Sequence, residues 1–164
     1  MWIDLAEISC TLKDYSGVAS LVEEYRAWDP ASPRLYVADE ILGRSLKNQA
    51  RFPQAREAFE RVIRHPQGKR TETAAKSQFL VAETYLLEKN FQQAQKEYLK
   101  VEVLYKFPQW QAPALFQSAV CLETLQKWKA AAADYDQLIK RYPESEYTAK
   151  ARARMPEVLK RAQG

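Results

Sequence analysis

Four segments of the chain repeat one pattern of side-chain types, and this repeat constrains the fold more than any other feature. In each segment a small residue is followed nine positions later by an aromatic residue. Three positions further on comes a small or β-branched residue, with large apolar residues four and seven positions beyond it, and each segment closes on a proline. The small residues are Ala6, Gly43, Ala82 and Ala119, spaced by 37, 39 and 37 residues. The aromatic residues are Tyr15, Phe52, Phe91 and Trp128. Five classes of position in register over four copies indicate a repeated structural unit.

Each copy predicts a helical hairpin. The first helix carries the small residue, a tight turn precedes the aromatic residue, and the second helix carries the rest of the pattern. Small side chains are required where two helix axes approach to 8–10 Å. Proline ends each second helix because it cannot continue the hydrogen-bond ladder. The predicted units are residues 1–30, 33–66, 71–108 and 111–143, with a terminal helix at 145–162. We therefore predict an all-α fold and a single array over residues 1–164.

The ends of the units carry cap signals. Ser32 with Pro33 is a cap and first-turn pair for the second unit, and Thr71 with Glu72 plays the same part in the third. In a fifth unit the small residue would fall on Pro156, which is unfavourable inside a helix unless the helix kinks or restarts. We expect residues 145–162 to form a helix that caps the last hairpin. Both chain ends resemble cuts through a longer array, although a natural terminal cap fits the C-terminus equally well.

Composition argues against catalysis and against bound metals or cofactors. The 164 residues include only 4 Gly, 1 His and 2 Cys, which leaves little for phosphate-binding loops or for metal cages of nitrogen and sulfur. His65 ends a predicted helix, where positive charge is favoured, and Cys121 lies among core residues. The adjacent carboxylates Asp39 and Glu40 point about 100° apart on a helix, so we expect solvated faces. We predict no enzyme, metal, cofactor or small-molecule substrate.

The pattern of small, aromatic, Ala, aromatic and closing Pro positions resembles the tetratricopeptide repeat. The resemblance implies a right-handed α-solenoid of four hairpins with a concave groove, and a non-catalytic scaffold for a peptide or protein partner. The longer units and the segment YPESEYTAKARARM at residues 142–155 resemble the bacterial cell-envelope branch. That branch includes the Tol–Pal coordinator and the lipoprotein of the outer-membrane assembly machine. It implies a periplasmic or envelope location, with the cytoplasm as the alternative.

The resemblance also implies that the first helices line the groove. Helical periodicity then selects the side chains opposite their packing faces. The selected groove residues are Glu40, Arg44, Lys47, Lys76, Phe79, Glu83, Leu86, Phe116, Val120 and Glu123. Phe79, Leu86, Phe116 and Val120 would form an apolar anchor patch; alternatively, Phe79 and Phe116 pack between neighbouring first helices. The cluster of Arg44, Lys47, Asn48 and Lys76 imitates the carboxylate clamp of chaperone-binding relatives, but Glu40 disfavours that interpretation.

Two alternative functions follow from other parts of the sequence. Trp2, Ile3 and Leu5 could form an apolar end face that stacks on another copy. Residues 1–50 carry 5 basic and 8 acidic side chains, whereas residues 51–164 carry 20 and 13. The basic C-terminal helix could therefore bind an acidic surface or nucleic acid, a less favoured reading because no dense basic stripe is present. Its basic residues are Lys150, Arg152, Arg154, Lys160 and Arg161. We expect no membrane span, since no apolar run is long enough.

Overall fold

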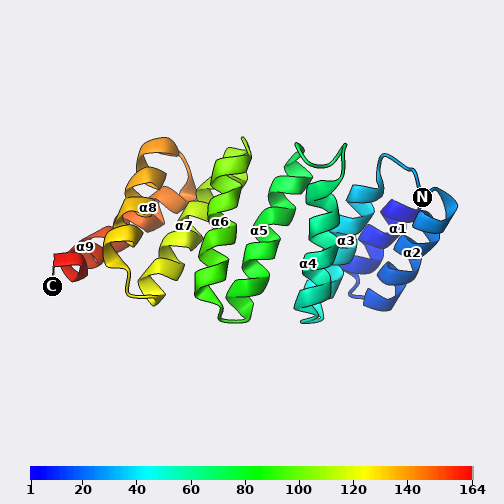
Figure 1. The fold of residues 1–164 in the computed structure, drawn as a ribbon, viewed down its shortest axis with the longest axis horizontal. Helices are drawn as coiled ribbons and strands as arrows, with labels where there is room; N and C mark the ends of the chain where they lie inside the picture. Colours follow the sequence, from blue (N-terminus) through cyan, green and yellow to red (C-terminus); the bar gives the residue numbers. More distant parts are fainter. Residues whose placement is uncertain (164) are drawn as a thin grey trace. The chain divides into compact units, whose positions relative to one another are not determined.

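The computed structural model describes residues 1–163, and this part of the chain consists of α-helices joined by short turns, without a β-strand (Figure 1). The predicted all-α repeat fold is confirmed. The helices are α1 (Trp2–Thr11), α2 (Tyr15–Trp28), α3 (Leu35–Asn48), α4 (Phe52–Arg64), α5 (Glu72–Leu87), α6 (Phe91–Leu104), α7 (Pro108–Thr124), α8 (Trp128–Arg141) and α9 (Glu146–Gln163).

The chain divides into two compact units, Met1–Thr84 and Tyr85–Gly164, with the boundary inside α5. In the first unit α1 packs on α2 and α3, α2 packs on α3, and α3 packs on α4. In the second unit α6 packs on α7, α7 packs on α8 and α9, and α8 packs on α9. Thus a first helix contacts both its own second helix and the first helix of a neighbouring hairpin. The assignment of all 164 residues to a single array stays a prediction.

The repeated small residues are all buried, and one of them marks a close approach between the two helices of its hairpin. Ala6, Ala82 and Ala119 are at most 1% exposed. At Gly43 the approach is closest, because a Cβ atom there would lie 2.4 Å from a ring carbon of Phe59. The large residues of the second helices are also buried: Val22, Phe59, Tyr98 and Tyr135. The repeat spacing is therefore the spacing of buried positions along the chain.

All four hairpin turns share one backbone geometry. A residue with a left-handed φ of 58° to 61° lies two positions before each repeated aromatic residue, and none of the four is glycine. The next backbone N–H donates to a carbonyl five residues earlier, at 2.8 to 3.0 Å. This six-to-one hydrogen bond after a left-handed residue is the Schellman motif, which satisfies a carbonyl at the helix end. The left-handed residues are Lys13, Ala50, Lys89 and Gln126.

The structure differs from the sequence prediction at three prolines. Pro108, expected to close the third unit, is instead the first residue of α7. Proline is tolerated there because the first N–H groups of a helix make no hydrogen bond within the helix. Pro33 precedes α3, which begins at Leu35, and the Ser32 hydroxyl lies 2.6 Å from the Tyr25 hydroxyl. Pro156 lies inside α9, which continues to Gln163 without a restart. The Thr71 prediction holds, since its hydroxyl accepts a hydrogen bond from the Ala74 N–H.

Candidate binding face on the first helices

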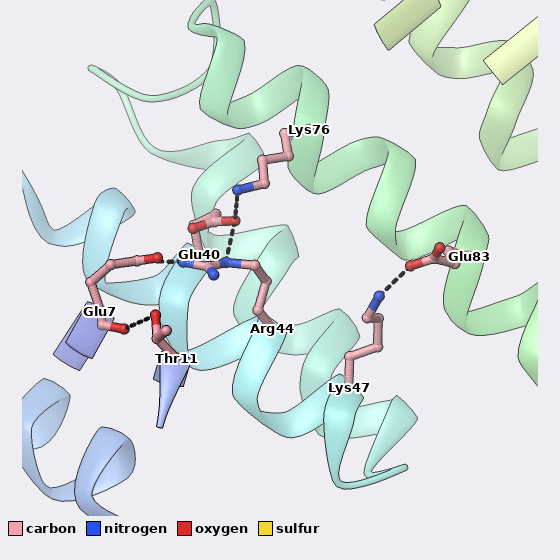
Figure 2. A network of polar contacts seen from close by, with 7 residues as sticks. All are labelled: Glu7, Thr11, Glu40, Arg44, Lys47, Lys76 and Glu83. Carbon is pink, nitrogen blue, oxygen red and sulfur yellow. Dashed lines mark hydrogen bonds and ion pairs between the residues drawn. The ribbon is translucent and has the colours of Figure 1, made fainter. Parts of the chain in front are cut away.

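The predicted groove residues lie on α3, α5 and α7, and five of them meet in one polar network within the first unit. Figure 2 shows this network, in which charged side chains of α1, α3 and α5 point toward one another. We call it the ion-pair ladder. Its members are Glu7, Glu40, Arg44, Lys47, Lys76 and Glu83.

Arg44 and Glu40 form the centre of the ladder. Arg44 Nη2 lies 2.5 Å from Glu7 Oε2, and its Nε lies 2.9 Å from Glu40 Oε1. Lys76 Nζ lies 2.8 Å from the same Glu40 oxygen. Glu40 therefore forms ion pairs with both Arg44 and Lys76. Burial alone would lower the pKa of Arg44, but Glu40 and Glu7 outweigh burial and raise it. The Glu40 side chain is 6% exposed and is stabilised by two cations.

The second rung of the ladder joins α3 to α5 through the Lys47–Glu83 ion pair. The rungs therefore connect successive first helices, α1 to α3 and α3 to α5. Three cations face three anions, so the ladder is electrically balanced. A carboxylate ligand would have to displace Glu40 or Glu83 from its lysine, which argues against a carboxylate clamp. The Lys76 side chain is 33% exposed and that of Glu83 is 32% exposed, so a partner can reach both.

In the second unit Glu123 joins α7 to α9 in the same way. Its carboxylate accepts hydrogen bonds from Arg154 Nε and Nη2, at 2.9 and 3.0 Å, and from the Tyr135 hydroxyl. Burial would raise the pKa of Glu123, but the hydrogen bonds from Arg154 and Tyr135 outweigh it and hold the pKa below its usual value. Arg154 of the basic C-terminal helix therefore already has an internal partner.

The four predicted apolar anchors are half-buried, so none of them is fully open to solvent. Phe116 is half-buried, with ring centroids 5.8 Å from Tyr135 and 5.5 Å from Tyr147, so it packs among α7, α8 and α9. This arrangement corresponds to the alternative in which Phe116 packs between neighbouring first helices, here α7 and α9. The remaining three members of the predicted patch are also half-buried: Phe79, Leu86 and Val120.

Glu7 is a ladder member that the sequence reading missed. It follows Ala6 by one position, and Arg44 and Glu83 occupy the same position after Gly43 and Ala82. Opposite charges at one repeat position in successive units were the signal that could have identified it.

The expectation that Asp39 and Glu40 are solvated was wrong. Asp39 is 2% exposed and lies 2.7 Å from Arg26 Nη2 and 2.8 Å from Arg61 Nε. These residues, with His65, line a cleft of about 520 Å³ beside α4. The sequence could not show this, because the partners of Asp39 come from two other helices. Buried carboxylates with two cations each are structural elements of this unit.

Other reactive groups are sparse in the part of the chain that the structure describes. Cys10 and Cys121 are buried free thiols, and burial raises the pKa of Cys121 to about 11. Over residues 1–163, no cluster of three or more His, Cys, Asp or Glu side chains could hold a metal ion. Within the same range no helix has the length and apolar character to cross a membrane.

Residues 113–145, which cover most of α7 and all of α8, match the family model of the tetratricopeptide repeat. This segment is similar in sequence to a tetratricopeptide repeat. No curated protein sequence is significantly similar to the chain.

Three solved structures share the fold. A tetratricopeptide repeat protein from Parabacteroides merdae ATCC 43184 has a TM-score of 0.75 and 16% identity, over 96% of this chain and 58% of that one. The apo form of RapI has a TM-score of 0.72 and 14% identity, over 92% and 45%. MamA AMB-1 has a TM-score of 0.64 and 16% identity, over 99% and 86%. The chain therefore spans about half the length of the first two. These likenesses extend the tetratricopeptide-like fold to nearly the whole chain.

Proposed function

We propose that the protein is a non-catalytic scaffold that binds a polypeptide partner on the exposed side of the ion-pair ladder. The tetratricopeptide repeat is in general a protein-interaction module, which supports the general role. The observation that carries the specific site is the ladder itself, because it holds polar side chains of α1, α3 and α5 in fixed positions on one face. A preorganised face loses less conformational entropy on binding.

The chemistry of the ladder indicates the kind of partner. Because its charges are balanced, a strongly acidic or strongly basic ligand would gain little without breaking an existing ion pair. Phe79 lies between Lys76 and Glu83 at helical spacing on α5 and is half-buried. We infer that an extended segment with an apolar side chain packs on Phe79, while neighbouring polar groups contact Lys76 and Glu83. Apolar anchors supply affinity and charged flanks supply register.

Selection from a random peptide library, followed by fluorescence anisotropy on a selected peptide, tests this proposal. Phe79→Ala should weaken binding at least tenfold, which corresponds to about 1.4 kcal/mol. Lys69→Ala, at an exposed basic position in the turn before α5, is the matched surface control and should leave the dissociation constant unchanged.

Circular dichroism must first show that both variants are folded. Equal affinity of the wild type and a folded Phe79→Ala variant for every selected peptide would refute the site. The cell-envelope resemblance and the compartment that it implies stay predictions from the sequence.

A further inference from the structure

Helix α6 carries aliphatic side chains on a side that is open to solvent. Val103 is 77% exposed and Leu104 is 62% exposed, while Leu99 is half-buried. Lys96 and Lys100 lie on the same side, because the five residues follow one another at spacings of three, one, three and one. Together they line a cleft of about 380 Å³. We call these five residues the α6 face.

The repeat shows that two of these positions are charged in other units. Leu99 and Val103 lie 17 and 21 positions after the repeated small residue Ala82. In the second and fourth units the same positions hold an ion pair: Glu60 with Arg64 at 2.7 Å, and Asp136 with Lys140 at 2.6 Å. These four side chains are at least 48% exposed, and the first unit also has an acidic residue, Glu23, at the first position. The third unit therefore replaces a solvated ion pair with two aliphatic residues.

The exposed charges on the α6 face are basic. Lys96 is exposed and, within the described residues, makes no ion pair. Lys100 lies 2.8 Å from Glu97, and its side chain is still 50% exposed. The two acidic residues of α6, Glu97 and Glu102, are buried, and Glu102 is already paired with Arg141. A molecule that approaches the α6 face therefore meets aliphatic side chains with positive charge beside them.

Charge and size distinguish the candidate occupants of this face. A second copy bound through the same face would bring lysines close to lysines. An anionic membrane attracts lysines, but such binding relies on clusters of about four to eight basic residues, and α6 has only Lys96 and Lys100. The face extends over eight residue steps, or about 12 Å of helix, which is the length of two turns of another helix. A helix with acidic residues beside an aliphatic row matches both the charge and the length.

We propose that the α6 face binds an amphipathic, acidic helix of a partner protein. Aliphatic side chains of that helix pack on Leu99, Val103 and Leu104. Its Asp or Glu side chains lie beside Lys96 and Lys100. Helices bound in this mode use anchors spaced by three and four residues, and complementary charges set their register. The α6 face shares no residue with the ion-pair ladder or with the peptide site on α5, so this inference is independent of the proposed function.

Selection from a library of helical peptides tests the proposal. Leucine is fixed in every peptide at the spacing of the α6 face, and the remaining positions are random. The selected peptides should be enriched in Asp and Glu beside the leucines, and fluorescence anisotropy gives their dissociation constants. Lys96→Glu should weaken the binding of a selected peptide, and the loss should be smaller at high salt because salt screens exposed charges.

The repeat itself supplies the decisive variant. Leu99→Glu with Val103→Arg copies the charged pair of the second and fourth units, and it should weaken binding by at least about tenfold. Val103→Arg alone changes a side chain that is 77% exposed and should also weaken binding, so the test remains available if the double variant unfolds. Lys69→Glu, at an exposed position in the turn before α5, and Phe79→Ala are the controls. Both should leave the dissociation constant unchanged, and circular dichroism checks that every variant is folded.

Three kinds of result would overturn the proposal. The first is a selection that returns no peptide whose binding Val103→Arg weakens, or one enriched in Lys and Arg instead of Asp and Glu. The second is a mass that rises with concentration in sedimentation equilibrium and that Val103→Arg returns to the monomer, which would assign the α6 face to a second copy. The third is binding to phosphatidylserine vesicles that the same variant abolishes, which would assign the face to a membrane.

Discussion

Replacing Gly43 with alanine tests whether the approach of the second helix determines the small residue in each first helix. A Cβ atom at position 43 would lie 2.4, 2.6 and 2.9 Å from three ring carbons of Phe59. Ordinary carbon contacts begin near 3.4 Å, so the ring or the helix must move by several tenths of an ångström or more. Phe59 is 0% exposed, and close-packed surroundings resist such a movement.

Two opposing effects set the magnitude. Alanine in place of glycine favours a helix interior by about 1 kcal/mol. Overpacking a filled core costs about 1–3 kcal/mol. The expected net result is a decrease of about 1 kcal/mol in the free energy of unfolding, or about 2–4 °C in Tm for a chain of this size. In a Phe59→Leu background the ring carbons are absent, and Gly43→Ala should then stabilise by up to about 1 kcal/mol. The two substitutions should therefore be coupled by about 2 kcal/mol.

Urea titration followed by tryptophan fluorescence measures both effects. Replacing Trp110 and Trp128 with phenylalanine leaves Trp2 and Trp28 as reporters of the unit Met1–Thr84, which contains the substituted pair. The four proteins of the double-mutant cycle are compared in this background. A higher urea midpoint for Gly43→Ala in the presence of Phe59 would refute the reasoning, and so would an equal shift in both backgrounds.

Three further predictions concern other parts of the molecule. Ala50 has a left-handed φ of 58°, a conformation that costs a non-glycine residue about 1–2 kcal/mol. Glycine removes this cost but adds conformational entropy to the unfolded chain, so Ala50→Gly should raise the free energy of unfolding by up to about 1 kcal/mol. The urea midpoint should rise accordingly, and a lower midpoint would contradict the turn geometry. The pKa of Glu123 is lowered from 4.5 in the folded protein, so its stabilisation is complete above pH 4.5 and is lost as the pH falls through the folded pKa. Glu123→Gln should therefore flatten the pH dependence of stability below about pH 4.5, as measured by thermal melts, and an unchanged acid limb would exclude the Arg154 interaction as its source. Burial raises the pKa of Cys121 to about 11. A thiol reagent at pH 8 should therefore react with Cys121 slowly in the native protein and at once in denaturant. Immediate reaction in the native protein would show that the core around Cys121 becomes accessible to solvent.

The sequence predicted the helices because each helix has only a few side chains that must be small or apolar, and these recur at fixed spacing. Asp39 and Glu40 were misjudged because burial depends on neighbours that local periodicity does not reveal. Arg44 pairs with Glu7, 37 residues away, a separation equal to the first repeat spacing. Interactions of this kind become predictable only when one unit is aligned on the next.

Proline is ambiguous in a different way. It is tolerated both after the end of a helix and at its first position, so the assignment of Pro108 to the end of the third unit was reasonable but wrong. Only the path of the backbone shows that α7 begins there. The candidate site had the same limitation. Periodicity selected one side of the first helices, but it could not show whether Phe116 faces solvent or packs against Tyr135 and Tyr147.

The left-handed residue in each of the four hairpin turns has a consequence for the order of folding events. Because none of these residues is glycine, an isolated turn is unfavourable and cannot start a hairpin by itself. Contacts between the two helices, such as Gly43 with Phe59, must form before or together with the turn that joins them. The turns should therefore be largely unformed in the transition state for folding. Substitutions at Ala50 should then change the activation free energy of folding much less than the free energy of unfolding, which is a small kinetic φ-value.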